Sequence, residues 1–270
     1  LMTENLNLDI EKIYITVYKT DDEAEKIWLD LGIPKERIYR FGDEDNWWGP
    51  AGDEGVCGPS SEINYYLGSD ENIPSKNDPK RKEKWGPNLH DDFIELYNLV
   101  FTQYYRDKNG KDTILPNKNI DTGMGLERML AVLQNVDNVY ETDAFLPIIH
   151  SVEKVSNIKW GRSEETDEAI RVVAEHARSA SFLIGDGVSP SNTGRGYVLR
   201  RLIRRGMLFA KKLNLLESPL SSLVPVVSRE MGEYYPELID NKNFIIEVIS
   251  KEEENFSKTL SNGQAVLDGM

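Results

Sequence analysis

One segment constrains the fold more than any other: the run from Phe93 to Arg106, which reads FIELYNLVFTQYYR. It is rich in aromatic and aliphatic residues, a composition typical of a β-strand. The dipeptide Asn109-Gly110 follows it and favours a hairpin turn. We therefore expect Thr113 to Leu115 to pair back onto this strand in an antiparallel arrangement.

Alternation of side chains along the strand separates two faces. One face is expected to carry Leu96, Asn98, Val100 and Thr102, and the other Glu95, Tyr97, Leu99 and Phe101. If the first face lines a pocket, Asn98 and Val100 lie near Asp121 further along the chain. A half-buried amide such as Asn98 needs a hydrogen-bond partner, which either the protein core or a ligand can supply.

Shorter patterns precede this strand. Ile13 to Lys19 predicts a strand, Asp21 to Leu31 a helix with acidic residues at its positive end, and Tyr39 to Phe41 another short strand. The run from Gly42 to Ser61 fits no period and is rich in Gly, Pro and acidic residues, so we expect an ordered loop. Residues 68–90 predict a polar surface segment with a low tendency to order.

The chain becomes almost entirely helical after residues 150–160. Helical spacing is expected in the segments 167–184, 195–212, 219–232 and 242–268. We therefore predict an α+β fold, in which an antiparallel-sheet domain, residues 1–155, precedes a helical domain, residues 156–270.

The composition indicates a globular cytoplasmic protein with no membrane partner. Of the 270 residues 29% are charged, no apolar run approaches the roughly 20 residues that cross a bilayer, and no signal peptide is evident. The single cysteine, Cys57, suits a reducing compartment and is expected to be a buried thiol. The net charge of −14 argues against a protein that coats DNA or RNA.

The run from Asp121 to Gln134 (DTGMGLERMLAVLQ) predicts a helix with a glycine-rich start. Gly123 and Gly125 lack a Cβ, so a ligand can approach the backbone, and a helix start favours phosphate or carboxylate. Arg128 is then placed to clamp a nucleotide phosphate or stack on a base. The alternative is an ordinary helix cap followed by a surface arginine.

Other signals are weaker. Glu62 begins an apolar stretch and could hold a metal ion or an amino group. The three histidines are far apart and no C-x-x-C or H-x-E spacing occurs, so no zinc site and no other protein-bound metal is expected. No P-loop is present, so a site for ATP would have to be of another kind.

The segment from Arg195 to Lys212 is basic in an acidic chain. On a helix one continuous arc would hold Arg200, Arg201, Arg204 and Arg205. The opposite side would hold Val198, Leu199, Leu202, Ile203 and Phe209. Such a stripe suits a nucleic-acid backbone, although ion pairs with acidic neighbours would explain it equally simply. Asn192 precedes this helix and either caps it or reads a base edge.

Several segments, in this order and spacing, resemble the alanine–tRNA ligase family of class II aminoacyl-tRNA synthetases. They are DDEAEKIW, GIPKERI, DNWWGPAGDEGVCGPSSEI, YNLVFTQ, DTGMGLERMLAVLQ and HARSASFLIGDGVSPSNTGRGYVLRRLIRR. The resemblance covers nearly the whole chain. It implies the back part of a class II catalytic core followed by a helical tRNA-recognition domain, and an activity that joins alanine to tRNA(Ala) at the expense of ATP with Mg²⁺.

The resemblance also implies roles for particular residues. DTGMGLER corresponds to the third class II motif, with Gly123, Gly125 and Arg128 at ATP. Asp121 would hold the α-ammonium group of alanine, so Asp121 and Arg128 are the expected catalytic residues. The alanine pocket would also be lined by Trp48, Asn98, Val100 and Gly123.

In the helical region, the resemblance implies that Asn192 reads the G·U pair of the tRNA acceptor stem. The four stem-facing arginines would be Arg200, Arg201, Arg204 and Arg205.

The chain also departs from the family pattern. The first two class II motifs, which include an arginine for the α-phosphate, would precede residue 1, and the editing domain would follow residue 270. Ser60 stands where the family often has Cys. We therefore expect a fragment. Two alternatives are a non-catalytic tRNA-binding paralogue and a class II-like ligase that charges another acceptor.

Overall fold

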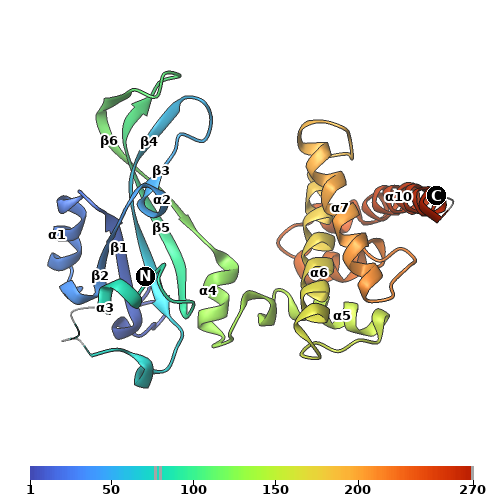
Figure 1. Cartoon of the computed structure of the whole chain (residues 1–270), viewed down its shortest axis with the longest axis horizontal. Helices are drawn as coiled ribbons and strands as arrows, with labels where there is room; N and C mark the ends of the chain where they lie inside the picture. Colours follow the sequence, from blue (N-terminus) through green and yellow to red (C-terminus); the bar gives the residue numbers. More distant parts are fainter. Residues whose placement is uncertain (76–77, 79–80, 269–270) are drawn as a thin grey trace. The chain divides into compact units, whose positions relative to one another are not determined.

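The computed structural model describes residues 1–75, 78 and 81–268. The chain divides into two compact units, Leu1–Val139 and Tyr140–Met270 (Figure 1). This division precedes the expected boundary at 155/156, because α5 (Leu146–Ser156) packs on the helices that follow it. The first unit is built on a sheet and the second on helices, so the predicted α+β class is confirmed.

A single sheet organises the first unit. Its strands are β1 (Ile13–Tyr18), β2 (Ile38–Phe41), β3 (Trp47–Trp48), β4 (Gly55–Tyr66), β5 (Phe93–Arg106) and β6 (Asp112–Met124). The order is β2-β1-β4-β5-β6, with β3 paired to β4 beside this path. β1 and β2 are parallel and all other pairs are antiparallel.

Short helices precede, connect and follow the strands. The α-helices are α1 (Asp22–Asp30), α2 (Asp43–Asn46), α3 (Arg81–Lys84) and α4 (Leu126–Leu133), and the 3-10 turns are η1 (Ile10–Lys12), η2 (Lys35–Arg37), η3 (Asp70–Asn72) and η4 (Val139–Glu141). The predicted elements at 13–19, 21–31, 39–41 and 93–106 are confirmed as β1, α1, β2 and β5. Asp21 caps α1 by accepting a hydrogen bond from the backbone N–H of Ala24 at 2.9 Å.

The prediction of a loop from Gly42 to Ser61 is wrong for most of that run, which contains α2, β3 and the first half of β4. β4 tolerates glycine and proline because its pairing with β5 shifts between Cys57 and Ser60. At Gly58 a Cβ would collide with the carbonyl oxygen of Phe101, so this close approach of two strands requires glycine.

The return strand after the hairpin is much longer than predicted. β6 continues through Met124, so the glycine-rich start expected for a helix is a strand, and α4 begins only at Leu126. A second register shift, between Ile63 and Asn64, places Leu96 in the same core cluster as Tyr97 rather than on the Asn98 face. The alternation of side chains along a strand does not predict bulges of this kind.

The expectation of a poorly ordered segment at 68–90 is wrong at its end, where Arg81 and Trp85 are buried. Residues 76–77 and 79–80 of that segment lie outside the described residues. Trp85 joins an aromatic cluster with Tyr14, Tyr39 and Tyr66.

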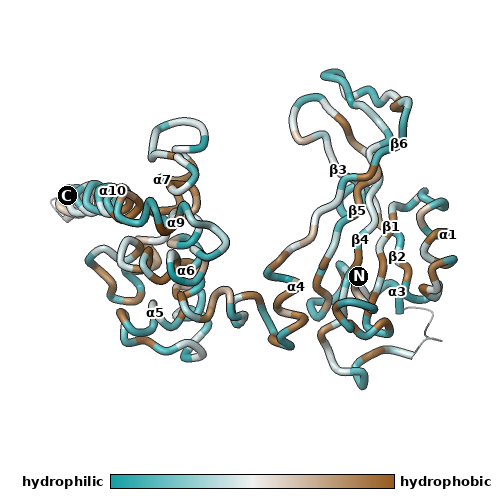
Figure 2. The backbone as a smooth tube through the Cα atoms, turned by 180° about the vertical axis from the view of Figure 1, so that it is seen from behind, coloured by the Kyte–Doolittle hydropathy of each residue, from teal (hydrophilic) through white to brown (hydrophobic). Residues whose placement is uncertain are grey.

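Helices α1 and α4 contribute Ala24, Met129 and Val132 to the apolar core that lies against the sheet. Figure 2 shows hydrophobic residues recurring along α4 and the central strands.

The second unit is a helical bundle. Besides α5 it contains α6 (Glu164–Gly185), α7 (Gly194–Lys212), η5 (Ser221–Leu223), α8 (Val224–Met231), α9 (Glu237–Asp240) and α10 (Lys242–Asp268), which confirms the four predicted helical segments. Leu199 and Ile203 of α7 are fully buried in its core. Val198 was expected on the same apolar side but is 52% exposed, because α7 is in contact with its neighbours over a narrower stripe.

Replacement of Gly58 by alanine tests the close approach of β4 and β5. The new Cβ would push apart two paired strands, and we expect Gly58→Ala to lower the free energy of unfolding by about 2–3 kcal/mol. Urea unfolding followed by tryptophan fluorescence measures this change. Gly52→Ala is the matched control, since nothing lies within 4 Å of a Cβ there; equal stability of the two variants would contradict the packing described.

Candidate functional site

The β5–β6 ladder brings four of the predicted site residues together. Asn98 is opposite Gly123, and Val100 is opposite Asp121. Directly opposed residues in an antiparallel pair project from the same face, so these four positions form one patch on the sheet. The predicted proximity of Asn98 and Val100 to Asp121 is therefore confirmed, although Asp121 lies within β6 and not at a helix start.

Asp121 and Gly123 are exposed, whereas Val100 is buried. Nothing lies within 4 Å of a Cβ built on Gly123, so the space above this residue is open. The Oδ1 atom of Asn98 is buried and has no hydrogen-bond partner among the described residues. A buried acceptor without a donor is unfavourable and is typical of a position that a ligand or water completes.

Glu62 extends the patch onto β4, where it is opposite Asn98. Its side chain is 7% exposed and accepts a hydrogen bond from Thr16 Oγ1 at 2.9 Å. Burial raises the pKa of the Glu62 carboxyl to about 7, while the hydrogen bond from Thr16 acts in the opposite direction. The sequence indicated Glu62 as a possible ligand. It missed Thr16, which bonds to Glu62, and Asn46, which bonds to Thr16, because both come from distant segments.

Trp48 reaches this region from the other edge of β4. It is opposite Gly58, two positions from Ser60, which is opposite Val100. Its side chain is 39% exposed. The neighbouring Trp47 is stacked on Tyr104, with ring centroids 5.7 Å apart. β4 therefore separates Trp48 from the patch on β5 and β6.

Arg128 lies in the first turn of α4 and is paired with Glu95. Its Nη1 donates to Glu95 Oε2 at 2.9 Å and to the backbone carbonyl of Glu95 at 3.1 Å. The guanidinium is about half exposed. Gly125, which precedes α4, lets the stem of Arg128 lie close to the backbone, since a Cβ there would be 3.2 Å from Arg128 Cδ. An anionic ligand would have to compete with Glu95 for this cation.

The basic helix in the second unit is less uniform than predicted. Arg200 and Arg204 face α10, where their Nε atoms lie 3.5 and 2.8 Å from the buried carboxylate of Glu252. Arg205 shares a 2.8 Å hydrogen bond with His176. Arg201 is exposed.

The ion-pair alternative thus holds for Arg200 and Arg204, and RNA binding by the four arginines stays a prediction. Asn192 is exposed, and its Oδ1 accepts a hydrogen bond from Arg200, which fixes the loop before α7 to the helix.

Comparison with known proteins agrees with this geometry. The sequence profile of the family described as tRNA synthetases class II (A) matches residues 1–270. The chain belongs to the class II tRNA synthetases. It is 46% identical over 267 residues to an alanine–tRNA ligase of Dehalococcoides mccartyi and 46% identical over 268 residues to one of Thermotoga petrophila, in each case over 99% of this chain.

This class II synthetase chain spans only 30% of the length of those two relatives. An alanine–tRNA ligase of Oleidesulfovibrio alaskensis is also 46% identical, over 275 residues, with the same 30% share of its length. Similarity over so much of this chain supports its fold and family.

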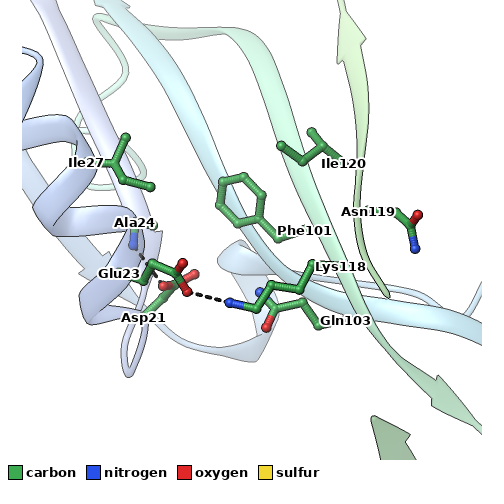
Figure 3. A pocket seen from close by; sticks show the side chains of 9 residues that line it. All are labelled: Asp21, Glu23, Ala24, Ile27, Phe101, Gln103, Lys118, Asn119 and Ile120. Carbon is green, nitrogen blue, oxygen red and sulfur yellow. Dashed lines mark hydrogen bonds and ion pairs between the residues drawn. The ribbon is translucent and has the colours of Figure 1, made fainter. Parts of the chain in front are cut away.

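The first unit also has a pocket away from the patch. About 190 Å³ lies between α1 and the β5–β6 pair, lined by Ile27, Phe101 and Ile120 and bounded by an ion pair between Lys118 and Glu23 at 2.6 Å (Figure 3). Phe101 and Ile120 are opposed in the ladder, and they alternate with Val100 and Asp121. The pocket therefore opens on the opposite face of the sheet from the patch.

Among the residues that the structure describes, no group of three or more His, Cys, Asp and Glu side chains is arranged to hold a metal ion. None of the helices described is long and apolar enough to cross a bilayer.

Replacement of Glu62 by glutamine tests its unusual protonation. Folding raises the pKa of Glu62 from 4.5 to about 7. Between these two pH values the folded state therefore binds more protons than the unfolded state, and the free energy of unfolding falls as pH rises. Glutamine does not titrate. We therefore expect the stability of Glu62→Gln relative to wild type to rise by roughly 2 kcal/mol from pH 5 to pH 8.

Urea unfolding at the two pH values measures the effect, with Glu4→Gln, an exposed site, as the control. A difference between Glu62→Gln and wild type that does not change with pH would show that Glu62 has an ordinary pKa.

Proposed function

We propose that this chain is part of an enzyme that activates alanine with ATP and transfers it to tRNA(Ala), and that the patch on β5 and β6 is where alanine binds. The observation that carries the proposal is the register that opposes Asn98 to Gly123 and Val100 to Asp121. The 46% identity to alanine–tRNA ligases supports the choice of amino acid.

The patch has the chemistry that a small amino acid requires. Asp121 is an exposed carboxylate suited to the α-ammonium group, and Val100 offers an apolar surface to a methyl group. The open space at Gly123 admits a ligand close to the backbone. We propose that the indole of Trp48 reaches across β4 from β3 to wall the pocket. One methyl or hydroxyl group changes binding by only about 1–3 kcal/mol, so we expect weak rejection of glycine and serine.

The nucleotide is proposed to lie toward Gly125 and Arg128. Arg128 is half exposed and paired with Glu95, so its guanidinium can be redirected to the adenine ring or a phosphate of ATP. Mg²⁺, which class II synthetases generally use with ATP, would share the phosphate charge.

The proposed reaction has two steps. A carboxylate oxygen of alanine attacks the α-phosphorus of ATP, and pyrophosphate leaves as the new P–O bond forms. A terminal ribose hydroxyl of tRNA then attacks the carbonyl carbon of alanyl-adenylate, loses its proton and displaces AMP. No side chain of this chain needs to form a covalent bond, since the work is positioning and charge stabilisation.

We propose that the second unit binds the acceptor stem through Asn192, Arg201 and Arg205. Arg201 is exposed, and Arg205 shares a hydrogen bond with His176 and lies over the Phe209 ring without a carboxylate partner among the described ion pairs. Arg200 and Arg204 would reach RNA phosphates only by leaving Glu252. The proposed compartment is the cytoplasm, where tRNA charging takes place.

Asp121→Asn tests the amino-acid site. Without the carboxylate charge the α-ammonium group loses its partner, and we expect alanine-dependent ATP–pyrophosphate exchange to fall at least 100-fold in a version lengthened to match the relatives. Asp30→Asn, at an exposed aspartate at the end of α1, is the control. Exchange at the wild-type rate in Asp121→Asn would remove Asp121 from the site.

Asn192→Ala tests the separation of the two sites in the same lengthened enzyme. We expect alanyl-adenylate formation to change less than twofold, while the preference for tRNA with a G·U acceptor-stem pair over one with G·C falls about tenfold. Aminoacylation of the two tRNAs measures the preference. A fall in adenylate formation instead would contradict the assignment of Asn192 to RNA.

A non-catalytic paralogue would bind tRNA and show no exchange even when lengthened. A ligase for another acceptor would show exchange without charging tRNA.

A further inference from the structure

Three buried side chains from three separate elements form a hydrogen-bonded chain beside the patch. Asn46 Nδ2 donates to Thr16 Oγ1 at 2.8 Å, and Thr16 Oγ1 donates to Glu62 Oε2 at 2.9 Å. Asn46 and Thr16 are fully buried, and Glu62 nearly so. Thr16 acts as acceptor and donor at once, so only a hydroxyl at this position joins the other two. We call Asn46, Thr16 and Glu62 the relay.

The relay begins immediately before the two tryptophans. Asn46 is the last residue of α2, and Trp47-Trp48 form the whole of β3. A strand of two residues has only two opposed positions, Pro59 and Gly58, to hold it on β4. The side-chain bond from Asn46 to Thr16 on β1 is therefore an additional anchor for this segment.

The relay ends on the row of the sheet that contains the patch. Glu62 is opposite Thr16 on one side and Asn98 on the other. Asn98 is in turn opposite Gly123. The anchor of the tryptophan segment and the positions proposed to bind alanine are thus neighbours in one ladder.

Two polar atoms suggest that this arrangement is maintained for a ligand and not for stability alone. Asn46 Oδ1 and Asn98 Oδ1 are buried on either side of Glu62 and have no hydrogen-bond partners among the described residues. A core selected only for stability would avoid such atoms, since each has lost its water without a replacement.

We infer that the relay positions Trp48 against the alanine site, so that Asn46, Thr16 and Glu62 determine the affinity for the amino acid without touching it. This inference rests on the proposed function. The three residues are positioning residues, because they act through the indole of Trp48.

The charge around Glu62 makes the relay sensitive to pH. The groups that face its carboxyl are Thr16 on β1, Asn64 on β4, Glu95 on β5 and Asp45 on α2, and none of them is a cation. A carboxylate is a stronger hydrogen-bond acceptor than a carboxylic acid. Protonation of Glu62 near pH 7 therefore weakens the hydrogen bond that Thr16 donates to it. The environment of Trp48 should therefore follow the titration of Glu62.

The first experiment observes the five indole N–H signals of this 270-residue chain by NMR between pH 5.5 and 8.5, with Trp48→Phe used to assign one of them. We expect the Trp48 signal to shift with a midpoint near pH 7 in wild type and in Thr16→Ser, which keeps the hydroxyl. The shift should be lost in Glu62→Gln and in Thr16→Val. A Trp48 signal that titrates alike in Thr16→Ser and Thr16→Val would overturn the relay.

The second experiment measures ATP–pyrophosphate exchange in the lengthened enzyme. Thr16→Val should raise KM for alanine about tenfold and change kcat and KM for ATP less than twofold, whereas Thr16→Ser should keep all three near wild type. If Thr16→Val does not fold, Asn46→Ala takes its place with the same expectation. An unchanged KM for alanine in a folded variant would overturn the inference.

The two experiments separate failure of the relay from failure of the proposed function. If the lengthened wild-type enzyme shows no alanine-dependent exchange, the proposed function fails, and the indole titration still decides whether the relay holds Trp48. If exchange occurs and KM for alanine does not respond to Thr16→Val, the function stands and the relay does not determine affinity.

Discussion

The antiparallel register of β4, β5 and β6 is the constraint on which the rest of the first unit depends. It places Glu62, Asn98 and Gly123 in one row and Ser60, Val100 and Asp121 in the next. A slip of β6 by one residue would turn Asp121 to the face of the sheet that carries Phe101, opposite to the face of Val100. The register of β4 on β5 shifts at Gly58 and again beside Ile63, and at Gly58 the close approach to the Phe101 carbonyl requires glycine.

Buried polar and charged side chains are paired differently in the two units. In the first unit Asn46, Thr16 and Glu62 form a buried network, and Asn46 Oδ1 and Asn98 Oδ1 have no hydrogen-bond partner among the described residues. In the second, the arginines of α7 are divided between an internal ion pair with Glu252 and exposed positions. A chain with a net charge of −14 can therefore keep a small basic surface while its other arginines hold helices together.

Much of this was predictable from the sequence. The strand at 93–106, the helix at 21–31 and the helices of the second unit follow from local periodicity, and alternation along β5 was enough to bring Asn98 and Val100 near Asp121. The errors arose where distant contacts override local pattern. Gly58 lies in a strand at a point where β4 closely approaches the backbone of Phe101. Residues 121–124 extend β6 because they pair with β5.

The relay was not predictable for the same reason. Thr16, Asn46 and Glu62 are ordinary residues in their own segments, and only the pairing of β1 with β4 and the return of α2 onto the sheet bring them within hydrogen-bond distance. The measurement that tests the account most directly is alanine-dependent ATP–pyrophosphate exchange on this 270-residue chain beside the lengthened version. We predict exchange in the lengthened version, with alanine favoured over other amino acids, and little or none in the shorter chain. No exchange in the lengthened version, or exchange that requires a different amino acid, would contradict the assignment of the β5–β6 patch to alanine.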